Sequence, residues 1–131
     1  MENVDSIIGL VRKLIKAENE RDKIIVELIL SKNFIAIMRA NGEEQNREEL
    51  LKRIENPTNT NIDRQFKGGR DIIPSSKKFG LIESIIMTMN KEKPNDMPKL
   101  FRNIHVFVKE DKWRCISWEV NEIKDEIKDE P

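Results

Sequence analysis

The sequence predicts an α+β domain in which three N-terminal helices pack on one face of a strongly curved antiparallel sheet. Helical patterns come first along the chain, and three long strand-like segments follow between Leu81 and Asn121. A chain of 131 residues is also long enough to form one domain with its own hydrophobic core. We therefore expect a single domain over residues 1–121, and we expect the charged tail over residues 122–131 to be disordered.

Three segments carry the signals of helices. In the first, apolar residues recur at three- and four-residue steps. These residues are Ile7, Leu10, Val11, Leu14 and Ile15. In the second, Asp22 is placed to cap a short helix over Lys23 to Leu30, which is apolar on most sides and should be largely buried. In the third, Asn46 and Glu49 have the spacing of a capping box at the start of a helix.

The strand-like segments are separated by turn signals. Asn33 to Arg39 is rich in β-forming residues and is followed by Asn41-Gly42, a strong turn signal. Leu81 to Asn90 predicts another strand. Between these two strands and after the third helix, Asn56 to Gly80 contains several glycines and prolines. We interpret it as a long loop of the kind that often covers a binding site, interrupted by a short strand over Arg64 to Lys67.

The segment from Leu100 to Asn121 predicts a hairpin, and it holds both tryptophans, the only histidine and the only cysteine. If Glu110-Asp111 is a two-residue loop, alternate residues divide the hairpin into two faces. One face changes from apolar to charged, as the wall of a small-molecule pocket often does. Its candidate ligand-binding residues are Trp113, Cys115, Ser117, Arg102 and Glu119. The other face would suit a dimer interface, and its candidate residues are His105, Phe107 and Trp118.

Individual side chains of the hairpin allow more than one interpretation. Arg102 and Glu119 could form a cross-strand ion pair, which we favour, or they could grip an anionic ligand and act as a base. His105 has a pKa suited to proton transfer, but on this register it lies on the outer face. Cys115 is expected to be an inert packed thiol, because no basic neighbour is evident.

Composition excludes several classes of protein. Basic and acidic residues balance at 24 each, which argues against a general nucleic-acid binder. No apolar run approaches the length of a membrane-spanning helix, and one cysteine fits a reducing compartment, so we expect a cytoplasmic protein. One histidine and one cysteine form no recognisable metal-ligand set. Lys67-Gly68-Gly69-Arg70 lacks the Walker pattern, and no cofactor is expected.

Several motifs, in this order, resemble the SnoaL-like branch of the nuclear transport factor 2-like superfamily. They are AENERD at residues 17–22, Asn33-Phe34, Asn41-Gly42, REELLKRI at residues 47–54 and RNIHVFVKEDKWRCISWEV at residues 102–120. The resemblance covers nearly all of residues 4–122 and implies a cone-shaped, cystatin-like fold, often dimeric through the outer face of the sheet. The superfamily hosts many unrelated activities, so the fold does not choose a function.

The resemblance also allows a test for steroid-isomerase chemistry. Such enzymes use a tyrosine donor in the first helix and a carboxylate base on the first strand, and this chain has no tyrosine. The corresponding positions are near Leu14 and near Met38 or Arg39, so that reaction is not expected. We retain Leu14 and Met38 as pocket candidates. The leading hypothesis is a homodimeric SnoaL-like domain whose small apolar pocket binds a small hydrophobic or weakly anionic molecule, without established catalysis. The alternatives are a lyase or isomerase that uses Arg102 and Glu119, and a ligand-free association module.

Overall fold

The computed structural model describes residues 3–56, 61–73 and 78–123. The expected tail therefore lies almost entirely outside the described residues. The helices are α1 (Asn3–Glu20), α2 (Lys23–Ile29) and α3 (Arg47–Glu55). The strands are β1 (Leu30–Met38), β2 (Glu43–Asn46), β3 (Ile62–Ile73), β4 (Phe79–Asn90), β5 (Lys99–Lys109) and β6 (Trp113–Glu122).

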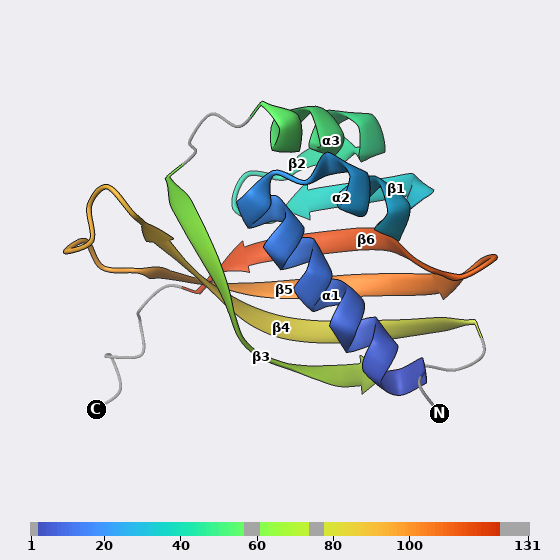
Figure 1. Ribbon diagram of the computed structural model, residues 1–131. Helices are drawn as coiled ribbons and strands as arrows, with labels where there is room; N and C mark the ends of the chain where they lie inside the picture. The colour runs from blue at the N-terminus through green and yellow to red at the C-terminus, as the bar shows by residue number, and fades with distance from the viewer. Residues whose placement is uncertain (1–2, 57–60, 74–77, 124–131) are drawn as a thin grey trace.

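The strands form one six-stranded sheet in the order β2-β1-β6-β5-β4-β3. Each neighbouring pair is antiparallel except β1 and β6, which are parallel. Figure 1 shows that the sheet is curved and that α1, α2 and α3 all lie on the same side of it. The predicted α+β architecture of three helices on one face of a curved sheet is confirmed. The core lies between these two layers.

The first two helices begin and end close to where the sequence predicts. The backbone of Arg21 takes a left-handed conformation with φ of 55°, and the N–H of Asp22 donates to the carbonyl of Ala17 at 2.8 Å, which closes the end of α1. The Asp22 side chain caps α2 by accepting from the N–H of Ile25 at 3.3 Å. The expected burial of α2 is wrong in part. Ile24 and Leu28 are 68% and 50% exposed, because only one side of this short helix contacts the core.

The capping box of α3 is confirmed. The Asn46 side chain accepts from the N–H of Glu49 at 2.9 Å, and the Glu49 carboxylate accepts from the N–H of Asn46 at 2.8 Å. The short strand β2 directly before it was not predicted. Its sequence, EEQN, has no alternation of apolar and polar residues, and it forms a strand because it pairs with β1 at the edge of the sheet.

The interpretation of residues 56–80 as a long loop is wrong over residues 62–73, which form the long edge strand β3. The short strand predicted over Arg64 to Lys67 lies within β3. Strand β3 pairs with β4 along its length, with irregularities of register between Phe66 and Gly68 and between Asp71 and Ile73. The irregularities remove the regular alternation that would reveal a strand. At Gly69 an added Cβ would lie 2.8 Å from the Phe66 ring, so this glycine allows the ring to pack against the strand.

The predicted register of the last hairpin is also wrong. The connection between β5 and β6 contains three residues, so Lys109 pairs with Trp113, and a bulge follows between the pairs of Phe107 and Val106. His105 consequently lies opposite Trp118. The extra loop residue and the bulge offset each other, so Ile104, Ser117 and Glu119 still share one face and His105 and Trp118 share the other, as the sequence predicts. The prediction is wrong about which of these faces lies against the helices. His105 and Phe107 are fully buried and Trp118 nearly so, and therefore none of them can form an outer dimer face.

Candidate functional site

A cavity of about 290 Å³ lies between the sheet, α1 and α3. Most of its wall is apolar. The apolar lining residues are Ile15, Ala36, Met38, Leu50, Ile54, Ile62, Ile86, Phe101, Trp118 and Val120. The polar lining residues are Glu18, Asn19, Arg21, Gln45, Arg53, Arg64, Thr88 and Asn103. A mostly apolar cavity with a few polar groups is the usual form of a small-molecule site.

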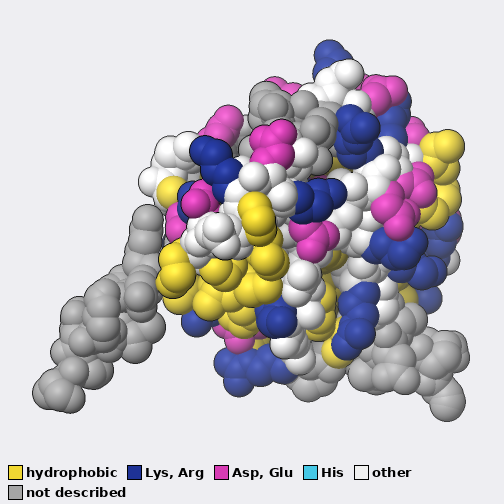
Figure 2. Space-filling model, turned by 60° about the vertical axis from the view of Figure 1, so that its left-hand side comes forward, with side chains coloured by type: hydrophobic (Ala, Val, Ile, Leu, Met, Phe, Trp, Pro, Cys, Tyr) yellow, Lys and Arg dark blue, Asp and Glu magenta, His cyan; other side chains and the backbone are white. Residues whose placement is uncertain are grey.

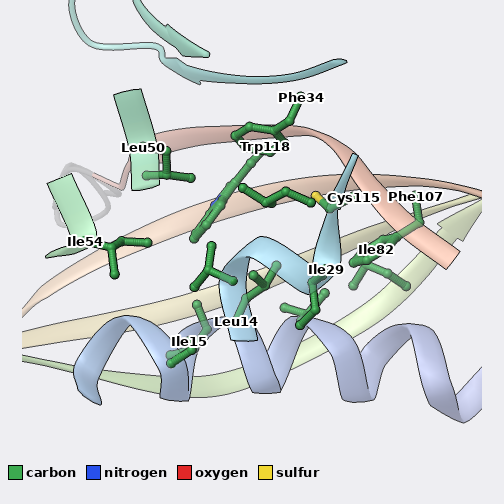
Figure 3. Close-up of a cluster of buried hydrophobic side chains, with 14 of the residues drawn as sticks. Leu14, Ile15, Ile29, Phe34, Leu50, Ile54, Ile82, Phe107, Cys115 and Trp118 are labelled. Carbon is green, nitrogen blue, oxygen red and sulfur yellow. The ribbon is translucent and has the colours of Figure 1, made fainter. Parts of the chain in front are cut away.

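Trp118 separates the cavity from the filled part of the core. In Figure 3 its indole extends from β6 toward α1, with Leu50 and Ile54 of α3 on one side. Cys115 and Phe107 lie on the other side, where the core is packed and contributes nothing to the cavity wall. The indole Nε1 donates to Oδ1 of Asn103 at 2.6 Å, which holds the ring in this orientation. The cavity is therefore a space that the core side chains leave open on one side of a positioned indole.

The charged groups of the cavity come from three separate elements. Glu18 lies in the last turn of α1, Arg53 in the last turn of α3, and Arg64 near the start of β3. The side chain of Glu18 is only 11% exposed, and its Oε1 lies 3.4 Å from Nε of Arg64. Burial raises the pKa of Glu18, while the positive charges of Arg64 and Arg53 act in the opposite direction. Both arginines are thus close enough to influence this one carboxyl group.

Asn19 joins α1 to the edge strand beside the cavity. Its Nδ2 donates to the carbonyl of Arg64 at 2.8 Å, and its Oδ1 accepts from the N–H of the same residue at 2.9 Å. This pair of bonds imitates the pairing of two strands and satisfies backbone groups of β3 that face the helix. It positions Arg64 at the cavity.

His105 is not part of the cavity wall. It is fully buried, its ring centroid lies 4.7 Å from that of Trp118, and neither ring nitrogen has a hydrogen-bond partner within the described structure. Burial lowers the pKa of His105 to about 3, so the imidazole is neutral at physiological pH. In agreement with this burial, no histidine side chain is visible on the face shown in Figure 2.

The structure places few of the predicted ligand-binding residues at the cavity. Met38 lines it, whereas Leu14 is part of the filled core. Trp113 packs against the core away from the cavity, and its ring contacts Lys109. Cys115 is buried in the core, and burial raises the pKa of its thiol well above the usual range. Trp118, which the sequence placed on the dimer face, lines the cavity instead.

The predicted pair of Arg102 and Glu119 is not formed, and both residues lie on the face of the sheet opposite the helices, as Ser117 does. Nε of Arg102 lies 3.0 Å from Oε2 of Glu83, and Oε2 of Glu119 lies 2.7 Å from Nε of Arg39. The sequence assignment to the pocket side rested on the change from apolar to charged residues along this face of the hairpin. These side chains alternate with the buried Asn103, His105 and Trp118, so they project away from the helices.

Glu18, Arg53, Arg64 and Asn103 were missed in the sequence. One signal could have found Glu18. It lies four residues after Leu14, so it continues the apolar stripe of α1 with a charged residue. A charge on the buried face of a helix indicates a functional or paired group. Arg53 and Arg64 carry no such local signal, because the tertiary structure brings them together.

Two further features bear on function. Among the described residues, no group of three or more His, Cys, Asp or Glu side chains could hold a metal ion. No helix within the described part of the chain is long and apolar enough to cross a membrane.

The architecture and the cavity define a protein of the nuclear transport factor 2-like, or cystatin-like, fold. The chain is similar to an NTF2-like protein from Cytophaga hutchinsonii, with 19% identity, a TM-score of 0.76 and coverage of 94% of this chain and 100% of that one. A CaMKII hub from S. rosetta has 10% identity, a TM-score of 0.79 and coverage of 94% and 98%. A ketosteroid isomerase-like protein from Erwinia carotovora atroseptica has 13% identity, a TM-score of 0.70 and coverage of 95% and 98%.

These similarities show the fold. No protein-family model matches the sequence, and no curated protein matches it either.

Proposed function

We propose that this protein is a small-molecule-binding domain of the SnoaL-like kind and that its cavity takes a small, mainly apolar molecule. The observation that carries the proposal is the open cavity of about 290 Å³ beside Trp118, at the edge of the cluster of buried hydrophobic residues. Since a water molecule takes about 30 Å³ of liquid, the cavity has room for roughly ten non-hydrogen atoms. Its size is near the lower end of the range for ligand pockets.

Catalysis is not part of the proposal. The lyase or isomerase alternative relied on Arg102 and Glu119, which lie on the opposite face of the sheet and pair with other residues. At the positions considered for steroid-isomerase chemistry, the structure has the apolar side chains of Leu14 and Met38. Without a donor or a base there, binding is the function that the geometry supports best.

The tryptophan in the cavity wall provides the test. In a Trp113→Phe background, Trp118 is the only tryptophan, and its fluorescence should change in a saturable way during titration with 1-octanol. Ala36 lines the cavity, so Ala36→Phe should fill part of the space and weaken binding at least tenfold. Ala40→Phe makes the same change at an exposed turn and should leave binding unchanged. Absence of saturable binding, or equal binding by the Ala36→Phe variant, would contradict the proposal.

Self-association is a second candidate function, supported by the sheet face that none of the described helices covers. Half-buried apolar side chains occupy this face. Along each strand they alternate with the residues that face the core. They are Ile35, Ile37, Leu81, Ile85, Met87, Ile104, Val106 and Val108. The similarity to a protein named a hub also supports association, and a homodimer is the simplest form.

Light scattering during size-exclusion chromatography tests this second function. Ile104 lies in the middle of the uncovered face, so Ile104→Asp should convert a dimer into a monomer. Ala40→Asp introduces the same charge at an exposed turn and should leave the molar mass unchanged. A wild-type monomer at high concentration, or a dimer that tolerates Ile104→Asp, would exclude this face as the interface.

A further inference from the structure

We infer that the cavity selects a short amphiphile with a single carboxylate group, which binds to the arginines of the cavity while the apolar chain fills the interior. The inference rests on the proposed small-molecule function and names the chemical class of the ligand. Three observations carry it: the charge of the lining residues, two arginines that form no ion pair among the described residues, and the apolar character of the remaining wall.

The first observation is an excess of positive charge that is local to the cavity. Three arginines, Arg21, Arg53 and Arg64, and one carboxylate, Glu18, line it. The whole chain has equal numbers of basic and acidic residues, so this surplus of two cations is not a general property of the surface. A concave site that collects one sign of charge attracts ligands of the opposite sign.

The second observation concerns which arginines are available. Arg64 is engaged by Glu18 at 3.4 Å and by the backbone bonds of Asn19. Within the described parts of the chain, Arg21 and Arg53 form no ion pair, although both contribute to the cavity wall. A guanidinium group presents parallel N–H donors that match the two oxygens of a carboxylate. The two unpaired arginines are thus the groups that would bind the anionic end.

The third observation limits the ligand to one charge. Apart from the four charged residues and the side chains of Asn19, Gln45, Thr88 and Asn103, the wall is made of aliphatic and aromatic side chains. The amide oxygen of Asn103 already accepts from Trp118, and its amide nitrogen donates to the carbonyl of Phe101 at 3.3 Å. A second ionic group would be buried there without a partner of opposite charge, at a high cost in free energy. The interior therefore suits a short hydrocarbon chain.

Octanoate and octanamide form the test pair, because they have the same shape and roughly ten non-hydrogen atoms, the number that the cavity accommodates. Both are titrated into the Trp113→Phe protein, and Trp118 fluorescence is followed. We expect octanoate to bind about tenfold more tightly than octanamide at low salt, and the difference to shrink as salt screens the charges. Arg53→Gln should lower the affinity for octanoate to that for octanamide and leave octanamide binding unchanged.

Lys52→Gln is the matched control, since Lys52 is an exposed cation next to Arg53 on α3 and does not line the cavity. It should leave the ratio of the two affinities unchanged. Equal affinities of the wild-type cavity for octanoate and octanamide would overturn the inference and leave the proposed function intact. An equal effect of Lys52→Gln and Arg53→Gln would overturn it as well. If neither probe binds, the proposed function fails and the inference fails with it.

Discussion

The buried imidazole of His105 makes the stability of this protein depend on pH. The side chain is fully buried against Trp118 and Phe107, and burial lowers its pKa from 6.5 to about 3. In the unfolded chain the imidazole has its ordinary pKa and takes up a proton as the pH falls below 6.5. In the folded state the buried imidazole stays unprotonated over the same pH range, down to about pH 3. A depressed folded-state pKa therefore contributes stability that is present above pH 6.5 and is lost as the pH falls toward 3.

The magnitude follows from the two pKa values. Between them the unfolded state holds one proton more than the folded state, so the free energy of unfolding falls by about 1.4 kcal/mol for each pH unit. From pH 7.5 to pH 5.0 the expected loss from His105 is about 2 kcal/mol. Glu18 acts in the opposite direction. Its raised pKa lets the folded state bind a proton more readily than the unfolded state at low pH.

Because the two effects oppose each other, the assay compares variants. Urea unfolding of the wild type and His105→Leu is measured at several pH values between about 5.0 and 7.5. Leucine keeps an apolar group of similar size and removes two ring nitrogens that lack partners, so it should not destabilise the protein at pH 7.5. The wild type should lose about 2 kcal/mol more than the variant on acidification. Identical pH dependence of the two proteins would refute the reasoning.

A spectroscopic measurement gives an independent check that does not depend on the variant. His105 is the only histidine, so a single set of imidazole signals appears in the NMR spectrum. In the folded protein these signals should not titrate between about pH 5 and pH 8. A titration midpoint near 6.5 in the folded state would show that the imidazole is accessible to water, contrary to its burial in the structure.

Three further results are expected. Gly69→Ala should lower the free energy of unfolding in urea by about 1–3 kcal/mol, because the new Cβ would meet the Phe66 ring. Gly68→Ala places its Cβ in open space and should lower the free energy of unfolding much less. Equal effects of the two substitutions would count against this packing. Cys115 should resist a thiol reagent in the folded state and react fully in denaturant, and rapid native labelling would contradict its burial. Asn46→Ala should lower the free energy of unfolding by about 1 kcal/mol through loss of the α3 cap, and an unchanged value would show that the cap is dispensable.

The sequence predicted the parts of the fold that depend on neighbouring residues. The stripe of α1, the Asp22 cap of α2 and the capping box of α3 rely on contacts between residues three or four positions apart. The order of helices and strands then indicated one helical layer on one sheet. Only the part of the edge strand β3 over Arg64 to Lys67 was predicted, because its register irregularities and its two consecutive glycines resemble a loop.

The candidate site was predicted less well. Met38 was identified, but Arg102 and Glu119 were assigned to the helix side of the sheet. Both faces of the hairpin carry apolar residues, so alternation along the strands does not show which face packs on the helices. Which face packs on the helices depends on tertiary contacts. The side chains of His105, Phe107 and Trp118 are buried on the helix side, where their burial removes apolar surface from water.

By itself, the sequence determined the helices, most of the strands and the class of the fold, because periodicity and capping act over a few residues. Only the tertiary structure decided which residues form the cavity. Glu18, Arg53 and Arg64 come from α1, α3 and β3 and meet only after the helices pack on the sheet. Their proximity depends on the packing of whole elements, and no local pattern in the chain encodes a distance between residues so far apart in sequence.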